Sequence, residues 1–263
     1  MRYIDYMCRI AAYLGPPILL RQFLLEPDHS LMVQSWAPQE MKEAKLNADG
    51  FGFGWYAADG KPAIYTNPMP IWTDPNLDGL ARVLSTDLWL AYVRSATRRT
   101  DVSHANTQPF CDSDLIFTHN GYIDQFGETL RHNIRHALST ECEKTIHGNT
   151  DSEYLFALLR QHLMQNENLD VALPELFKLL AKWAGEVRLL LNIVIARNDA
   201  IIATRHAING DSPSLYYSTN ETRFPNGQLV ASEPLTDRSN WKEVPEHHIL
   251  FLSRDNEPVL TPL

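Results

Sequence analysis

The chain has 263 residues, and its 23 Lys and Arg against 32 Asp and Glu give a formal net charge of −9 at pH 7. This length permits one large domain or two small ones, and a hydrophobic fraction of 44% excludes a disordered chain. The acidic balance argues against nucleic acid or an anionic membrane surface as the main partner.

The N-terminal segment carries no recognisable export or membrane signal. Its apolar stretch Ile10–Leu14 is cut by Gly15-Pro16-Pro17 and is too short for a signal-peptide core. No run approaches the roughly 18 apolar residues that a membrane-spanning helix needs. The three cysteines are an odd and sparse set, which favours a reducing compartment over a disulfide scaffold. We therefore expect a cytoplasmic protein.

The first half of the chain is typical of short strands separated by turns. The stretch Ile10–Leu14 suits a buried strand that ends at the Gly-Pro-Pro turn, and Asp59-Gly60 is typical of a hairpin turn. Later apolar runs have the length of strands that are buried on both faces. The strands expected here cover residues 10–14, 51–56, 63–65, 88–93 and 115–118.

Two helices are predicted in the middle of the chain. Thr150 begins the first as the N-cap of a capping box with Glu153, and leucines at helical spacing follow. A second apolar stripe runs over residues 173–180, with Pro174 near the start, where proline is tolerated. Further strands are expected at 189–196, 201–204, 215–218, 229–231 and 249–252. Strands, a helical middle and strands again predict an α+β fold.

Cys8 directly follows Met7 and is a candidate nucleophile. If translation starts at Met7, or a short leader is removed, Cys8 becomes the N-terminal residue. Its α-amine, with a pKa of about 7.7–8.0, would then be partly neutral at pH 7 and able to take the thiol proton. The alternative for Cys8 alone is a buried structural cysteine in the first strand.

The dipeptide Asn120-Gly121 has two interpretations. Between apolar residues, Asn-Gly is a common hairpin turn, and for the dipeptide considered alone we favour this interpretation. The alternative is functional, because the Asn120 amide and the Gly121 N–H could both donate to a developing oxyanion.

Arg94 and Asp151 are candidate binding residues of opposite charge. Arg94 ends an apolar strand, where its guanidinium could grip a carboxylate through two hydrogen bonds or remain a solvated charge. Asp151 lies in the first turn of the capped helix, where it could bind an ammonium group or complement the helix dipole. No metal site is expected, because His132 and His136 lack an intervening acid and an accompanying cysteine pair.

Seven short motifs in a fixed order make a more specific pattern than any one of them. From Met7 nearly to the end, the chain resembles the class II glutamine amidotransferases, which are N-terminal nucleophile hydrolases. One departure is Tyr92, which stands where many synthetase-linked members have histidine. The motifs are Met7-Cys8-Arg9, Asn47-Ala48-Asp49-Gly50-Phe51-Gly52, Val93-Arg94-Ser95-Ala96-Thr97, Asn106-Thr107-Gln108-Pro109-Phe110, His119-Asn120-Gly121, Thr150-Asp151-Ser152-Glu153 and Ala231-Ser232-Glu233-Pro234-Leu235.

The resemblance implies a four-layer αββα sandwich and a shared mechanism. Cys8 would attack a γ-glutamyl amide to form a thioester, with Asn120 and Gly121 holding the oxyanion. Arg94 would bind the α-carboxylate and Asp151 the α-ammonium of the substrate. No metal or organic cofactor is implied. The other residues implied to line the pocket are Thr97, Gln108, Asn47, Asp49 and Gly50.

Segments such as His29-Ser30-Leu31 and Trp241–Pro245 make the chain most similar to the members of this family that act in ergothioneine biosynthesis. We therefore expect a hydrolase of a small γ-glutamyl metabolite, with residues 1–7 as a leader or mis-assigned start and 8–263 as the working domain. Two alternatives stay open. The protein could be a glutaminase subunit that passes ammonia to a separate synthetase, or an inactive γ-glutamyl-binding module.

Overall fold

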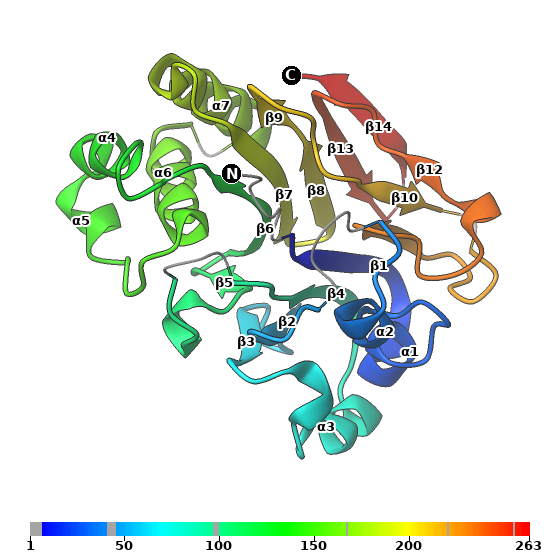
Figure 1. Ribbon diagram of the computed structural model, residues 1–263. Coiled ribbons are helices and arrows are strands. Elements are labelled where there is room, and N and C mark those ends of the chain that lie inside the picture. The colour runs from blue at the N-terminus through cyan, green and yellow to red at the C-terminus, as the bar shows by residue number, and fades with distance from the viewer. Residues whose placement is uncertain (1–6, 41–45, 97–99, 167, 220, 255) are drawn as a thin grey trace.

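The computed structural model describes residues 7–40, 46–96, 100–166, 168–219, 221–254 and 256–263 (Figure 1). Within these ranges two antiparallel sheets pack face to face, and helices cover the outer face of each sheet. In Figure 1, helices α4 to α7 lie on one side of the paired sheets and α1 to α3 on the other.

The first sheet has the strand order β12-β10-β11-β1-β4-β2-β3. The strand β1 runs through Gly15-Pro16-Pro17, so the expected strand end at that turn is wrong. Its pairing with β4 breaks between Leu14 and Ile18 and then resumes, so the prolines lie where no ladder N–H is needed. The strands are β1 (Arg9–Leu19), β2 (Phe51–Tyr56), β3 (Pro62–Asn67), β4 (Ser85–Val93), β10 (Tyr216–Ser218), β11 (Gln228–Ala231) and β12 (Lys242–Glu243).

The second sheet has the order β14-β13-β8-β7-β6-β5, and β9 also pairs with β7. The strand β6 continues through Asn120 and Gly121, which pair with Asn192 and Leu191 of β7. The hairpin-turn interpretation of Asn120-Gly121 is therefore wrong. The strands are β5 (Phe110–Cys111), β6 (Leu115–Ile123), β7 (Leu189–Arg197), β8 (Ala200–Arg205), β9 (Ala207–Ile208), β13 (His248–Ser253) and β14 (Asn256–Pro262).

The two predicted helices are present, with two differences in detail. Thr150 Oγ1 accepts from Glu153 N at 3.3 Å, but the Glu153 carboxylate accepts from the backbone N–H groups of His147 and Gly148 and not from that of Thr150. The second helix begins at Leu169, so Pro174 lies beyond its first turn. The α-helices are α1 (Leu20–Leu24), α2 (Leu31–Trp36), α3 (Leu77–Val83), α4 (Arg131–Ala137), α5 (Thr140–Glu143), α6 (Asp151–Asn166) and α7 (Leu169–Ala184), and the 3₁₀ turns are η1 (Ile71–Thr73), η2 (His104–Asn106) and η3 (Arg238–Asn240).

Three apolar clusters separate the four layers. One joins α6 and α7 to the second sheet, and another joins α1, α2 and α3 to the first sheet. The third lies between the sheets. The alternation of β1 shows the division, because Ile10 and Leu14 point into the middle cluster while Ala11 and Tyr13 point toward the helices. The predicted αββα sandwich is confirmed.

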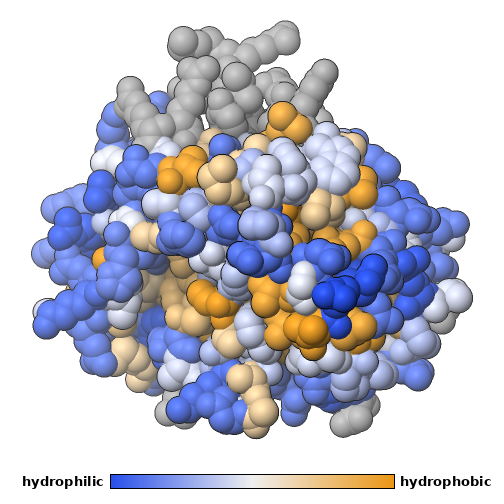
Figure 2. Space-filling model, turned by 90° about the horizontal axis from the view of Figure 1, so that it is seen from below, coloured by the Kyte–Doolittle hydropathy of each residue, from blue (hydrophilic) through white to orange (hydrophobic). Residues whose placement is uncertain are grey.

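The face of the molecule shown in Figure 2 carries apolar areas among polar side chains. Trp36 and Trp72 are among the exposed large apolar side chains, and their rings meet edge to face at 5.9 Å. In the part of the chain that the structure describes, the helices are too short or too polar to cross a membrane.

Candidate active site

Cys8 lies just before β1, where the antiparallel pairing with β4 brings it beside the residues that follow β4. Arg9 pairs with Val93, so Cys8 meets the segment that begins at Arg94. Its Sγ donates to Ser95 O at 3.5 Å and accepts from Ser95 N at 3.4 Å. The Tyr92 hydroxyl donates to the same sulfur at 2.7 Å. The sheet register therefore holds the thiol between three groups of β4 and the loop after it.

The surroundings of Cys8 both oppose and support its ionisation. Burial raises the pKa of the thiol, because a thiolate there has lost most of its water. The hydrogen bonds from Tyr92 and Ser95 and the positive charges of Arg94 and Arg9 act in the opposite direction. The pKa remains above its ordinary value. A nucleophile in this position therefore needs a base to remove its proton.

Asn120 is linked through Ser232 to β1, the strand that follows the candidate nucleophile Cys8, from the other sheet. Ser232 Oγ accepts from Ile10 N at 3.0 Å and from Asn120 Nδ2 at 3.2 Å, and so joins the two sheets beside Cys8. A Cβ atom on Gly121 would lie 1.8 Å from Leu190 O, so no larger residue fits there. Among the described residues Ser232 is the acceptor for one N–H of the Asn120 amide, and the second N–H can donate to another acceptor.

Gln108 and His119 hold this part of β6 in place. Gln108 Oε1 accepts from His119 N at 2.6 Å and its Nε2 donates to His119 O at 3.1 Å. The His119 ring lies between Ser152 Oγ at 2.9 Å and Leu190 O at 2.8 Å. Burial lowers the pKa of His119 although the Asp151 charge opposes this, so the neutral ring donates from Nε2 to Leu190 O. Both ends of the Gln108 amide are thus engaged with the backbone of β6.

Arg94 is buried, and its guanidinium is held by neutral groups. It donates to the backbone oxygens of Asp49 and Asp101 at 3.4 and 3.1 Å. It also donates to Thr100 Oγ1 at 3.3 Å. None of its described partners is a carboxylate, so the positive charge is available to an anion.

The segment 47–50 forms a wall beside Arg94. The backbones of Asp49 and Gly50 pair with that of Arg94 at 3.0 and 2.8 Å, and Asp49 Oδ2 accepts from Ala96 N at 2.8 Å. Gly50 has a φ of +124°, which favours glycine. Asn47 is buried and donates from Nδ2 to Gln34 O at 3.3 Å, next to the end of α2.

Asp151 lies at the first turn of α6, against the far end of β6. Its Oδ2 accepts from Ile123 N at 2.7 Å and its Oδ1 from Ser152 N at 2.8 Å. Its charge raises the pKa of Tyr92 whereas that of Arg94 lowers it, and the Tyr92 hydroxyl contacts Cys8. Both candidate binding charges therefore act on the group that contacts the candidate nucleophile. Thr97 lies outside the described residues.

Three contacts near the candidate nucleophile Cys8 involve residues to which the sequence motifs assigned no role. Tyr92 bonds to Cys8 Sγ, Ser232 joins Ile10 to Asn120, and Arg9 forms an ion pair with Glu233 at 2.8 Å. Arg9 and Glu233 are both buried. The sequence did contain a signal for the Arg9 contact. Arg9 adjoins the apolar run of a buried strand, and a buried charge there needs a partner of opposite charge.

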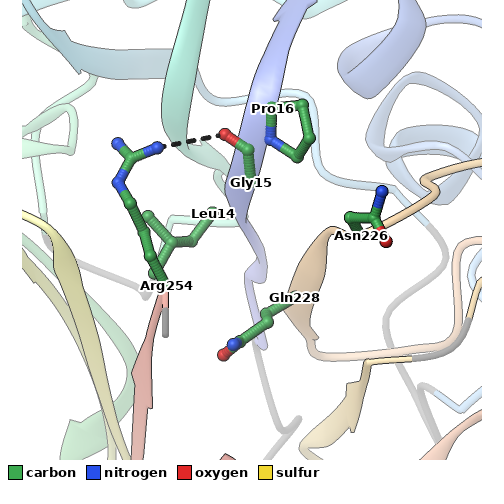
Figure 3. A pocket seen from close by; sticks show the side chains of 6 residues that line it. All are labelled: Leu14, Gly15, Pro16, Asn226, Gln228 and Arg254. Atoms are coloured by element: carbon green, nitrogen blue, oxygen red, sulfur yellow. Dashed lines mark hydrogen bonds between the residues drawn. The ribbon is translucent and has the colours of Figure 1, made fainter. Parts of the chain in front are cut away.

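A separate pocket of about 250 Å³ lies beside the middle of β1, away from Cys8 (Figure 3). Arg254 reaches into it and donates to Gly15 O at 3.3 Å, while ion pairs to Asp87 and Asp199 balance its charge. None of the expected site residues lines it. Its lining is Leu14, Gly15, Pro16, Asn226, Gln228 and Arg254. Among the residues that the structure describes, no three His, Cys, Asp or Glu side chains cluster as metal ligands would.

The fold is similar to those of solved amidotransferases. The fold matches a class-II glutamine aminotransferase domain protein from Silicibacter pomeroyi with a TM-score of 0.72 and 25% identity, over 97% of this chain and 99% of that chain. It also matches glutamine phosphoribosylpyrophosphate amidotransferase from B. subtilis with a TM-score of 0.61 and 14% identity, over 97% of this chain and 49% of that chain. The fold is that of the N-terminal nucleophile amidotransferases.

The family follows from the sequence comparisons. The family model for class-II glutamine amidotransferases matches residues 22–261, and the chain belongs to this family. A relative from Mycolicibacterium smegmatis, a γ-glutamyl-hercynylcysteine sulfoxide hydrolase, is 31% identical over 98% of this chain and 100% of its own length. The expected family membership is confirmed.

Proposed function

We propose that the protein hydrolyses the γ-glutamyl amide bond of a small metabolite, and that γ-glutamyl hercynylcysteine sulfoxide or a similar compound is the substrate. The observation that carries the proposal is the contact through Ser232, which brings the Asn120 amide beside the strand of Cys8. The full-length similarity to the mycobacterial hydrolase supports the choice of substrate.

The proposed reaction begins with Cys8 as the N-terminal residue, after removal of residues 1–7. Its α-amine takes the thiol proton, and Sγ attacks the γ-carbonyl carbon. Asn120 Nδ2 and Gly121 N–H stabilise the oxyanion of the tetrahedral intermediate. The C–N bond breaks, the proton leaves on the amine, and a γ-glutamyl thioester remains. Water then attacks the thioester, releasing glutamate and restoring the thiol.

The glutamyl group carries one carboxylate and one ammonium, and the site offers one charge of each sign. In the proposal Arg94 binds the α-carboxylate, which its neutral partners support. Asp151 binds the α-ammonium with the lone pairs that its backbone contacts leave. The wall 47–50 shapes the pocket through Asn47, Asp49 and Gly50. Gln108 supports β6, and Thr97 remains a predicted pocket residue.

A glutaminase subunit that supplies ammonia to a separate synthetase is the second candidate. It is favoured by the match to 49% of the phosphoribosylpyrophosphate amidotransferase chain, because this chain resembles one part of a larger protein. Such a synthetase or pathway protein would be its partner. We also propose a cytoplasmic location, which the three free cysteines favour.

The test combines N-terminal sequencing of the native protein with a screen of γ-glutamyl compounds. We expect the chain to begin at Cys8, and glutamate release from γ-glutamyl hercynylcysteine sulfoxide to exceed that from glutamine. Cys8→Ala should abolish turnover with the fold intact, whereas Cys142→Ala, at a second buried thiol, should retain it. An active protein that keeps residues 1–7 would overturn the role of the amine. Glutamine hydrolysis that depends on a copurifying synthetase would favour the second candidate.

A further inference from the structure

Tyr92 presents a buried hydroxyl to the candidate nucleophile. It lies on β4 opposite Ile10 of β1 and Gly52 of β2, in the middle of three paired strands. Its side chain is 3% exposed, and its hydroxyl donates to Cys8 Sγ at 2.7 Å. A buried hydroxyl generally keeps a hydrogen-bond partner, and here the described partner is a sulfur atom. A thiol is a weak acceptor, whereas a thiolate carries a full charge.

The sulfur needs such a donor because water has little access to it. Cys8 is 7% exposed, and the other donor to its sulfur is Ser95 N at the longer distance of 3.4 Å. The pKa of Tyr92 is raised well above its ordinary value, mainly by burial and next by the charge of Cys8. Tyr92 therefore keeps its proton at neutral pH and remains a donor when Cys8 is ionised.

We propose that Tyr92 is a further catalytic residue, whose hydroxyl donates a hydrogen bond to the Cys8 thiolate. The bond acts twice in each turnover. It stabilises the sulfur when the thiol loses its proton to the base, and again when the thioester carbon–sulfur bond breaks and the electron pair returns to sulfur. No proton leaves Tyr92 in either step. The role in turnover rests on the proposed function, but the contact itself is testable without substrate.

A structural role for Tyr92 is the competing explanation, since its ring packs in the middle cluster. Tyr92→Phe keeps the ring and removes the hydroxyl. Tyr56→Phe is the matched control, because the Tyr56 ring packs against the same cluster. Its hydroxyl lies within hydrogen-bond distance of the backbone oxygens of Asp114 and Ala196, at 2.9 and 3.0 Å, so its hydrogen bonds within the described residues are to groups other than the Cys8 sulfur.

The experiment measures the rate at which iodoacetamide alkylates Cys8 as a function of pH, with the Cys8 peptide quantified by mass spectrometry. The protein is used in its native processed form, so the same α-amine is present in every variant. We expect Tyr92→Phe to raise the midpoint of the alkylation profile by about one to two pH units, because the variant loses one hydrogen bond to a charged group. Tyr56→Phe should leave the midpoint where it is in the wild type.

Turnover provides the second readout. In Tyr92→Phe, kcat/KM should fall about 10- to 100-fold at pH 7 and recover as the pH rises above the shifted midpoint. An unchanged alkylation midpoint, or an equal shift in Tyr56→Phe, would overturn the proposal. If the wild-type protein releases no glutamate from any γ-glutamyl compound, the proposed function fails, and the alkylation midpoint still decides the contact between Tyr92 and Cys8.

Discussion

The guanidinium of Arg9 forms an ion pair with the carboxylate of Glu233 at 2.8 Å, and neither side chain is more than 1% exposed. Arg9 Nη1 donates to Cys8 O at 2.9 Å, directly behind the candidate nucleophile. The Glu233 carboxylate accepts from the backbone N–H groups of Gln39 and Glu40 and contacts His29 Nε2 at 2.7 Å. The ion pair therefore links β1, the strand that follows Cys8, to the segment after α2.

Glu233→Gln should strongly destabilise the fold, because it leaves the Arg9 charge buried without its counter-ion. We expect the free energy of unfolding to fall by about 3–5 kcal/mol. Urea unfolding measures this change, and Glu257→Gln on the exposed strand β14 is the control. Equal stability of the two variants would contradict a structural role for the ion pair.

The same carboxylate predicts a loss of stability in acid. Burial raises its pKa, but the hydrogen bond with His29, the charge of Arg9 and two backbone N–H groups outweigh burial and hold the pKa below the ordinary 4.5. This contribution is complete above pH 4.5 and is lost as the pH falls through the lower folded pKa. The stability difference between wild type and Glu233→Gln should therefore shrink below pH 4.5. A difference that is constant down to pH 2.5 would exclude this linkage.

Gly121→Ala should disrupt β6, because its Cβ would lie 1.8 Å from Leu190 O of the neighbouring strand. Backbone movement is needed to relieve this contact, and we expect a loss of about 3 kcal/mol in the free energy of unfolding. Gly127→Ala serves as the control, since a Cβ there meets nothing within 4 Å. Chemical denaturation measures the free energy of unfolding of both variants. A wild-type free energy for Gly121→Ala would show that the backbone of β6 moves at little cost.

Asn120→Ala should reduce kcat with little change in KM, because the second N–H of its amide is proposed to donate to the oxyanion, which exists in the intermediate and not in the bound substrate. The expected loss is about 10²–10³-fold. Ser232→Ala keeps the amide but removes its contact with the nucleophile strand, so we expect a smaller loss in that variant. Steady-state kinetics would count against the oxyanion role if Asn120→Ala raised KM and left kcat unchanged.

Arg94→Lys tests recognition of the α-carboxylate. Lysine keeps the charge but loses the planar pair of donors, so KM should rise about 10-fold or more while kcat falls less. Arg82→Lys on the exposed face of α3, where Arg82 pairs with Asp78, should behave like wild type. The comparison of KM and kcat for the three proteins decides the matter, and an unchanged KM in Arg94→Lys would remove Arg94 from the binding site.

Features that depend on a few neighbouring residues were predictable from the sequence. The apolar runs of β4 and β7 and the Thr150 cap of α6 are examples. Asn120-Gly121 shows the limit of such signals, because the same dipeptide suits a hairpin turn and a strand. Its place in β6 depends on pairing with β7, some 70 residues later in the chain.

The contacts around Cys8 depend on features that no local pattern encodes. Tyr92 reaches the sulfur because of the register between β1 and β4, and a shift of one residue would turn its ring to the other face of the sheet. Arg9 and Glu233 are more than 200 positions apart, and a spacing rule cannot pair them. The family motifs indicated which residues to consider, whereas their bonding depends on the tertiary fold.

The middle apolar layer has a consequence for catalysis that reaches beyond stability. Cys8 directly precedes β1 of one sheet and Asn120 lies in β6 of the other, so the distance between the proposed attacking sulfur and the proposed oxyanion donor depends on how the two sheets pack against each other. A displacement of about 1 Å can cost on the order of 10²-fold in rate. Side chains such as Leu90 and Val194, which contact no substrate in the proposed reaction, thereby set the separation between the two sheets and with it the geometry of the proposed site.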